Sequence, residues 1–506
     1  MTLPGGLDGL SGGCALRPLA VAVALLVAYG ISTAIYNLFF HPLRRFPGPK
    51  LYAMTRLPYA IDLARGDLVK TATRLHEQYG DVVRIAPGEL SFISGETAWS
   101  DIYGFRGGKS EELGKDLDWY LPAPNGTRSL LSAFREDHSR FRRVFSHAFS
   151  DRALREQEPL VQRYVDMLLQ RLREHAGQAV DMVRYYNFTT FDIIGDLTFN
   201  ESFGCLESDD YHSLVAGAFA SVRAISFRLA IHYYKLAERL YFALRPNGIH
   251  KGSSVFFDFT AARVDKRVNT DTNRPDFITF VERQSDSKSL RDEELKANCY
   301  LFLIAGSETT ATTLSGTTYL LLKHPQALAR LTAEVRDCFT NSDDITFEAA
   351  AKLPYLQAVL NEGLRLYPPV PTGFPRTVPR GGVTVSGHFI PEKTSVYVSQ
   401  YPANRSERNF AAPNSFIPER WLTADDEDPR FANDKKSVLM PFSSGPRNCL
   451  GKNLAYAELR AILAKVIFNF DMELVDDQTD WLDQKCFNLW EKSPLRVRIN
   501  LAKARV

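Results

Sequence analysis

The chain of 506 residues has almost no charge imbalance, because 61 Lys and Arg face 59 Asp and Glu, for a formal net charge of +2. Bulk nucleic-acid binding usually needs a concentrated basic surface, so this balance argues against it. Cysteines are few and scattered, with no Cys-x-x-Cys pair: Cys14, Cys205, Cys299, Cys338, Cys449 and Cys486. That spacing indicates neither a zinc site nor a disulfide framework, and it fits a reducing compartment. Repeats, low-complexity tracts and polar linkers are also missing, so nothing marks the roughly three domains that length alone suggests.

One long apolar run is present near the N-terminus. Leu19–Phe40 holds 22 residues without a charge, and a membrane-spanning helix needs about 20. A cleaved signal peptide is the alternative, but its apolar region is normally about 7–15 residues long. Basic residues are denser after the run than before it, where only Arg17 stands: Arg44, Arg45, Lys50 and Arg56. This asymmetry predicts a short lumenal segment (1–18), a transmembrane anchor (19–40), a basic, proline-containing hinge (41–50) and a cytosolic main body (51–506).

The remaining pattern predicts a mainly helical domain with minor sheet. Val82–Ile85 and Leu90–Ile93 are typical of short strands around the Pro87-Gly88 turn. Residues 137–280 are mostly helical in pattern, and Asp292–Leu322 runs 31 residues without proline. As one helix, that stretch would be roughly 47 Å long at 1.5 Å per residue. A small β region is expected around Ser386-Gly387, from residues 383–385, 389–390 and 396–398.

The most informative motif surrounds one cysteine, in Phe442-Ser-Ser-Gly445-Pro-Arg447-Asn-Cys449-Leu-Gly451. A helix beginning near Leu450 would direct its positive end at the Cys449 sulfur and favour the thiolate. Gly445 gives the turn access to unusual φ angles. The pattern therefore suits a rigidly held thiolate that binds an iron centre.

A second motif, Ala305-Gly306-Ser307-Glu308-Thr309-Thr310, puts polar residues inside an apolar helical stretch. A glycine in a helix interior costs about 1 kcal/mol relative to alanine. Such local inconsistencies often mark functional sites. The alternative is a kinked helix with back-bonded hydroxyls and an exposed glutamate.

A third set of residues suggests a buried ion network. Glu362 and Arg365 share a helix face at i, i+3. Taken alone, this spacing is common and usually marks a solvated pair. Here it is followed by Tyr367-Pro-Pro369 and then by Phe416-Ile-Pro-Glu-Arg420-Trp421.

These three motifs, in this order, resemble the cytochrome P450 family. The resemblance implies that Cys449 is the axial thiolate ligand of haem b, shielded by Phe442, with Gly451 allowing close approach of the macrocycle. It implies that Gly306 opens an oxygen groove, that Thr309 takes part in oxygen activation and that Glu308 lies on a proton path. Glu362, Arg365 and Arg420 would form the family's structural triad. The cations expected at the haem propionates are Arg447, Arg376 and Arg142, with His138 in the place of the family's usual tryptophan.

The implied enzyme is a membrane-anchored monooxygenase of the P450 fold. Electrons would come from NADPH through a flavoprotein reductase, with cytochrome b5 as a further donor, and Arg140, Arg143 and Lys452 would form a basic docking patch. His41–Lys50 and Ser146–Ser150 are similar to filamentous-fungal P450s of secondary metabolism. The substrate would then be a hydrophobic polyketide, terpenoid or alkaloid, contacted by residues 117–132, 219–234, 370–374 and 487–490. The predicted location is the endoplasmic reticulum membrane, single-pass. The alternatives are an O₂-independent isomerase, dehydratase or peroxygenase, and a haem sensor.

Overall fold

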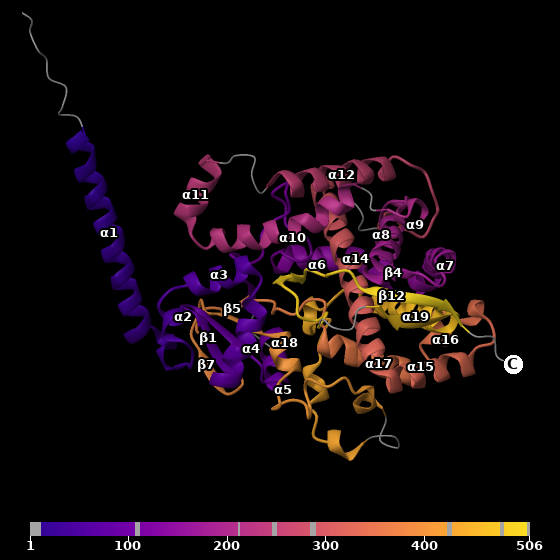
Figure 1. The fold of residues 1–506 in the computed structure, drawn as a ribbon. Coiled ribbons are helices and arrows are strands. Elements are labelled where there is room, and N and C mark those ends of the chain that lie inside the picture. The colour runs from indigo at the N-terminus through magenta and orange to yellow at the C-terminus, as the bar shows by residue number, and fades with distance from the viewer. Residues whose placement is uncertain are drawn as a thin grey trace, which may run out of the picture.

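The computed structural model describes residues 12–106, 112–210, 213–244, 250–283, 290–422, 428–475 and 480–502, without the side chains of 12–19, 213–222 and 250–253. Helices dominate this part of the chain (Figure 1), as the sequence predicts. In chain order they are α1 Gly12–Phe39, α2 Lys50–Met54, α3 Leu57–Arg65, α4 Leu68–Tyr79, α5 Gly95–Tyr103, α6 Arg135–Phe145, α7 Asp151–Glu174, α8 Met182–Phe199, α9 Cys205–Ser208, α10 Ser213–His232, α11 Lys235–Leu244, α12 His250–Val268, α13 Phe277–Glu282, α14 Asp292–Lys323, α15 Pro325–Cys338, α16 Phe347–Ala350, α17 Pro354–Leu366, α18 Gln400–Asn404 and α19 Lys452–Asn469.

The strands are short and fall into four small sheets. They are β1 Val82–Ala86, β2 Glu89–Phe92, β3 Gly114–Lys115, β4 Ala179–Asp181, β5 Arg376–Thr377, β6 Val383–Val385, β7 His388–Ile390, β8 Ser395–Val398, β9 Phe470–Leu474, β10 Cys486–Phe487, β11 Leu489–Trp490 and β12 Arg496–Leu501. The largest sheet has the order β1-β2-β8-β5-β3, and another has the order β4-β12-β9. The other two are the antiparallel hairpins β6-β7 and β10-β11.

One strand differs from its expected place. Residues 396–398 were expected beside 383–390, but β8 pairs in parallel with β2 and antiparallel with β5. All four residues of β8 are buried, whereas the β6-β7 hairpin has exposed positions. A fully buried strand is stabilised by neighbours on both edges, and β2 and β5 provide them.

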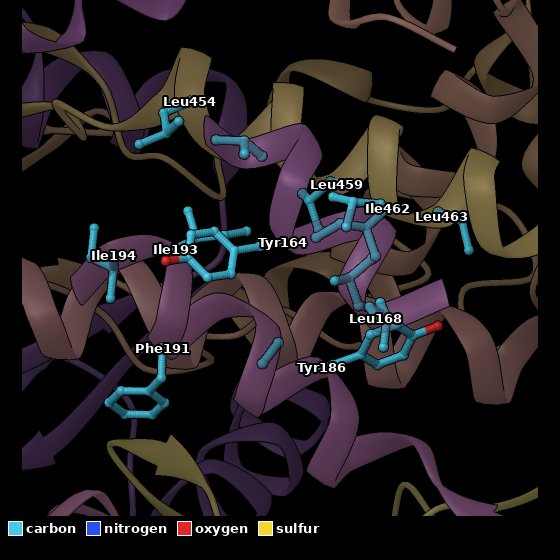
Figure 2. Packing of buried hydrophobic residues seen from close by; sticks show 14 of the residues in the cluster. Tyr164, Leu168, Tyr186, Phe191, Ile193, Ile194, Leu454, Leu459, Ile462 and Leu463 are labelled. Carbon is cyan, nitrogen blue, oxygen red and sulfur yellow. The ribbon is translucent and has the colours of Figure 1, made fainter. Parts of the chain in front are cut away.

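The long predicted helix is present as α14, with 32 residues, and it runs through the middle of the helical region (Figure 1). Three acidic residues in its first turn interact favourably with the positive end of the helix dipole, and Glu294 completes a capping box with Arg291. Helices α7, α8 and α19 contribute to the same apolar core as α14, through residues such as Tyr164, Phe191 and Ile462 (Figure 2). The predicted apolar face of α7 is buried from Leu160 to Leu172.

The N-terminal helix α1 projects away from the rest of the molecule (Figure 1). Its Ala20–Phe39 stretch is long and apolar enough to cross a membrane, and only 6% of the most apolar window is buried. The segment that follows packs onto the sheet region, with Leu43 and Phe46 buried in one cluster with β2 and β8. The buried Arg84 donates a hydrogen bond to the carbonyl oxygen of Asn37 (3.0 Å). Contacts with the domain therefore fix the end of α1.

Candidate active site

The Cys449 loop is closed by short backbone contacts. The N–H of Cys449 donates to the carbonyl oxygen of Phe442 (2.8 Å), and the N–H of Asn448 donates to that of Gly445 (3.1 Å). Gly445 has a φ of +71°, and a Cβ there would lie 1.9 Å from the carbonyl oxygen of Tyr103. Only glycine fits this turn without strain. The backbone thus turns sharply and presents the cysteine before α19.

The Cys449 thiol lies at the start of a helix, close to cations. Helix α19 begins at Lys452 with Gly451 as its N-cap, two residues later than expected. Cys449 has accessible surface, yet burial still raises its pKa. A hydrogen bond from the Gly451 N–H and the charges of Arg142 and Lys452 oppose that rise. These contacts stabilise the thiolate but do not outweigh burial, whereas a bound metal cation would deprotonate the thiol outright.

Two of the predicted cations hold the protein's own loop. Arg447 donates to Glu112 through Nε (3.1 Å) and Nη2 (2.7 Å), and through Nη1 to the Ala133 carbonyl oxygen (2.8 Å). Arg142 donates to the backbone carbonyl of Asn448 (2.7 Å) and to its side chain. Both guanidinium groups thereby brace the cysteine loop against α6 and the segment before β3. Their contact with a propionate stays a prediction.

The third cation, Arg376, is different. It is only 3% exposed, and its Nε and Nη1 atoms have no hydrogen-bond partner among the described residues. Lys115 lies beside it, because β3 pairs with β5 in the register Lys115 to Arg376. Burial, and then the charges of Arg376 and Arg447, lower the pKa of Lys115 well below its ordinary value. The buried Arg376 and the half-buried Lys115 therefore form a pair of basic groups that is short of negative charge.

His138 faces the same group of cations. It is 6% exposed, and burial together with the charges of Arg447 and Lys115 lowers its pKa to about 3. The imidazole is therefore neutral at physiological pH, and in that state one ring nitrogen donates and the other accepts. A neutral donor replaces the indole N–H that the family's tryptophan would offer.

On α14, the predicted residues point in different directions. The hydroxyl of Thr309 donates to the carbonyl oxygen of Ala305 (2.6 Å), and Ala305 is exposed although it is in the middle of a core helix. Glu308 is buried and forms an ion pair with Lys492. The alternative reading is therefore right about the back-bonded hydroxyl and wrong about an exposed glutamate. A Cβ at Gly306 would lie 2.6 Å from Cδ1 of Ile194 on α8. The missing side chain of Gly306 therefore permits helix packing, and its oxygen groove stays a prediction.

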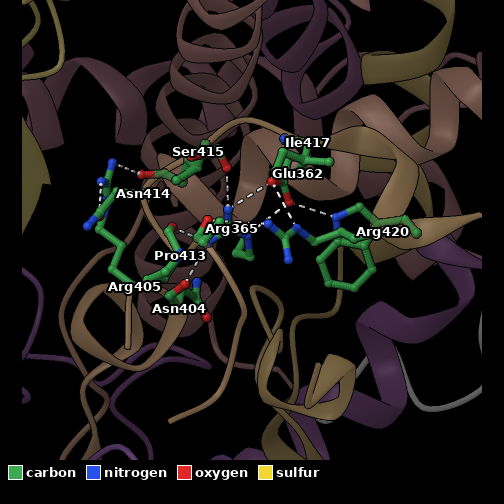
Figure 3. A network of polar contacts seen from close by, with 12 residues as sticks. Glu362, Arg365, Asn404, Arg405, Pro413, Asn414, Ser415, Ile417 and Arg420 are labelled. Carbon is green, nitrogen blue, oxygen red and sulfur yellow. Dashed lines mark hydrogen bonds and ion pairs between the residues drawn. The ribbon is translucent and has the colours of Figure 1, made fainter. Parts of the chain in front are cut away.

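The structure brings Glu362, Arg365 and Arg420 together in a fully buried network (Figure 3). Arg365 binds the Glu362 carboxylate through Nε and Nη2 (both 2.8 Å), and Arg420 Nε reaches it at 3.1 Å. Trp421 also donates to Glu362 (2.8 Å). Asp434 forms an ion pair with Arg420 and was not predicted. Two acids thus balance two guanidinium groups without solvent.

Three of the expected substrate segments meet around a narrow cavity of about 20 Å³, comparable to the space of one water. Its lining includes Trp119, Thr372 and Asn488, one from each segment. The Oγ1 of Thr372 and the Oδ1 of Asn488 have no hydrogen-bond partner among the described residues. The residues around the cavity thus include buried polar groups as well as an aromatic ring.

Comparison with known proteins identifies the family. The cytochrome P450 family model matches residues 47–496. The chain belongs to the cytochrome P450 family.

Its relatives include fungal enzymes with closely similar lengths. Cytochrome P450 monooxygenase lcsI of Purpureocillium lilacinum is 48% identical over 494 residues, which cover 96% of this chain and 94% of the relative. Cytochrome P450 monooxygenase traB of Penicillium crustosum is 46% identical, covering 94% of this chain and 96% of the relative. Averantin hydroxylase of Dothistroma septosporum is 44% identical, covering 97% and 93%.

The residues of this P450 fit the haem that its family implies. An accessible thiol at a helix N-terminus suits an axial iron ligand. The unpartnered N–H groups of the buried Arg376, with Lys115 beside it, suit the carboxylates of a macrocycle. The donor set and the charge of the site therefore agree with the cofactor.

Several residues of this P450's site escaped the sequence motifs. Glu112, Lys115 and Lys492 lie far in the sequence from the residues they contact; Glu112 and Arg447, for example, are 335 positions apart.

The expected basic patch also changes, because Arg140 pairs with Asp137 (2.6 Å) and Glu294 (2.8 Å). Its charge is compensated within the protein.

Proposed function

We propose that this P450 is a haem-thiolate monooxygenase that inserts one oxygen atom from O₂ into a hydrophobic small molecule of fungal secondary metabolism. The observation that carries the proposal is the Cys449 loop, which presents an accessible thiol at a helix start near the cations Arg142 and Lys452. The names of the similar fungal monooxygenases support the same activity. A polyketide, terpenoid or alkaloid intermediate is the proposed substrate class, because the expected substrate segments are rich in aromatic and aliphatic residues.

We assign the haem contacts as follows. Cys449 would bind the iron, and the bound haem would supply the oxygen-activating chemistry. Arg376 would hold a propionate, since its buried Nε and Nη1 atoms have no hydrogen-bond partner among the described residues. Lys115 and the neutral His138 would add donors on the same side. The remaining predicted residues shape the loop around the sulfur: Phe442, Gly445, Arg447, Gly451 and Arg142.

Proton delivery is assigned to α14. The Thr309 hydroxyl would orient protons at the oxygen side of the site, and Glu308 would supply them. General acid catalysis of this kind contributes typically 10²–10⁴-fold to rate. The Glu362 network has a structural role, because removing one partner of a buried ion pair costs about 3–5 kcal/mol.

The membrane arrangement follows from charge and helix length. Helix α1 would anchor the chain once in the endoplasmic reticulum membrane, with the catalytic domain on the cytosolic side, because the basic residues follow the span. A cytosolic face would let an NADPH–cytochrome P450 reductase, or cytochrome b5, deliver electrons.

The test is to express the full chain with an NADPH–cytochrome P450 reductase in yeast microsomes and to supply isotopically labelled O₂. The metabolites are compared with those of a Cys449→Ser strain. We expect a new product that carries one labelled oxygen, NADPH consumption that depends on O₂, and a red-shifted Soret band of the reduced, carbon-monoxide-treated wild type. Cys449→Ser should lose all three. A product that forms without O₂ or NADPH would favour an isomerase or dehydratase, and one that needs only peroxide would favour a peroxygenase.

A further inference from the structure

A buried lysine contacts the acid of the α14 motif. Lys492 lies in the link between β11 and β12, and its side chain is 4% exposed. Its ammonium group donates to Oε2 of Glu308 and to Oγ1 of Thr312 (2.9 Å). Thr312 also donates to the same carboxylate oxygen (3.3 Å). Lysine, glutamate and threonine thus form a compact cluster inside the protein.

The cluster points away from the Thr309 hydroxyl. Glu308 and Thr309 are consecutive on a helix of 3.6 residues per turn, so their side chains project about 100° apart. The Thr309 hydroxyl donates to the Ala305 carbonyl oxygen, whereas the Glu308 carboxylate accepts from Thr312 and Lys492. A carboxylate held in this way has to change its partners before it can pass a proton toward Thr309.

Burying the Lys492 ammonium group costs free energy, so its place beside Glu308 suggests a role other than stability. Lysine is almost never fully buried unless it is paired, and a buried ion pair often stabilises a protein no more than apolar residues of the same size would. Tyr367, directly after α17, is a titratable group close enough for the charge of Glu308 to raise its pKa. Burial keeps the pKa of Tyr367 well above its ordinary value, with the Cys486 thiol as the next contributor. Tyr367 is therefore neutral, and Lys492 supplies the positive charge that Glu308 meets here.

We propose that Lys492 is a positioning residue for proton delivery, which keeps Glu308 ionised and directed at Thr312 until the contact opens during turnover. The proposal rests on the assignment of Glu308 to the proton path. Lys492 follows the β10-β11 hairpin by two residues, and Asn488 of that hairpin lines the cavity. The segment that sets the position of Glu308 therefore adjoins a segment that we expect to contact substrate.

The first experiment measures the charge state of Glu308 without turnover. Infrared difference spectra are recorded for wild type against Glu308→Gln, and for Lys492→Met against the Lys492→Met/Glu308→Gln double variant. Wild type should show carboxylate bands. Lys492→Met should show the carbonyl stretch of a protonated acid, because a buried carboxyl without its cation favours the neutral form. A protonated acid in wild type, or a carboxylate in Lys492→Met, would overturn the proposal.

The second experiment measures coupling in the haem-loaded enzyme with reductase. Lys492→Met should lower kcat and the fraction of NADPH recovered in product by roughly tenfold or more, with KM unchanged, which is within the range of proton-transfer effects. The kcat of Lys492→Met should also gain a pH dependence that wild type lacks, and Lys492→Arg should restore most of the coupling. Lys352→Met, which removes an exposed pair with Glu348, is the matched control and should behave as wild type.

The outcomes separate this proposal from the proposed function. If wild type inserts oxygen but Lys492→Met keeps wild-type kcat, coupling and pH profile at full haem content, Lys492 has no positioning role. A change in KM alone would make it a substrate contact. If Lys492→Met does not fold, the double variant, which removes both charges, replaces it. Folded protein in which neither Glu308→Gln nor the double variant loses coupling would refute the role of the cluster. Failure of wild type itself to use O₂ and NADPH would instead refute the proposed function.

Discussion

At the scale of single residues, Glu458 is a buried acid without a cationic partner among the described residues. It lies on α19, nine residues after Cys449, and is 4% exposed. The Thr310 hydroxyl donates to it at 3.3 Å. Burial raises its pKa from 4.5 to about 8, and the bond from Thr310 opposes that rise. The carboxyl group is therefore protonated in the folded enzyme at neutral pH.

This shift predicts a loss of stability with rising pH. The folded state holds the Glu458 proton more tightly than the unfolded state does, so the stabilisation is complete below pH 4.5 and falls until about pH 8. One pKa unit corresponds to about 1.4 kcal/mol. Denaturant unfolding of the haem-loaded protein at pH 5 and pH 8 should therefore show a decrease of a few kcal/mol in wild type that Glu458→Gln lacks. Parallel pH dependences in the two proteins would contradict the prediction.

Residues that carry a motif were predictable, and residues that meet them through space were not. Gly445 and Cys449 belong to one loop, so their spacing alone indicated a turn and a thiolate. Lys115 and Lys492 have no local signal, because a lysine in a short strand or link is usually solvated. Their burial depends on pairing between segments that only the fold brings together, such as β3 with β5.

At the scale of elements, the length of α14 was predictable from the sequence. The need for glycine at position 306 was not, because it comes from packing against α8. The absence of proline and the acidic first turn set the bounds of α14. The strand β8 was misplaced because alternation in the sequence predicts a strand but not its neighbours. Gly306 was assigned to the oxygen site from its motif, whereas its missing side chain faces Ile194 on α8. A glycine required by helix packing cannot be recognised from the sequence before the partner helix is known.

The packing of α14 on α8 makes a prediction at that contact. Gly306→Ala places a methyl group 2.6 Å from Cδ1 of Ile194, and such overpacking costs about 1–3 kcal/mol. Ile194→Val removes that Cδ1 atom and costs about 0.5–1.5 kcal/mol by itself. The double variant should lose less unfolding free energy, measured with denaturant, than the two single variants lose in total.

The same variants distinguish packing from the predicted oxygen groove. If Gly306 serves the groove alone, Gly306→Ala should lower product formation without a change in unfolding free energy, and Ile194→Val should not restore it. If packing dominates, stability and activity should recover together in the double variant.

At the scale of the whole molecule, α1 and the rest of the chain are joined by a docked segment. Leu43 is fully buried and Phe46 is 8% exposed, and the N–H of Arg84 donates to the Pro47 carbonyl oxygen (2.7 Å). Helix α1 ends at Phe39, before this proline-containing stretch, and the apolar residues of the stretch pack on the sheet region. The direction of α1 relative to the rest of the molecule is therefore set by specific contacts.

Two truncations test this arrangement. Removal of residues 1–40 deletes the span and keeps the docked segment, so the protein should leave the membrane fraction and still show the red-shifted Soret band. Removal of residues 1–50 also deletes Leu43 and Phe46, whose burial stabilises by about 1.5–3 kcal/mol each. The shorter protein should therefore unfold at lower denaturant concentration and retain less haem. Equal stability of the two truncations would mean that 41–50 is a free tether, and membrane retention of the 41–506 protein would place a second attachment in the catalytic domain.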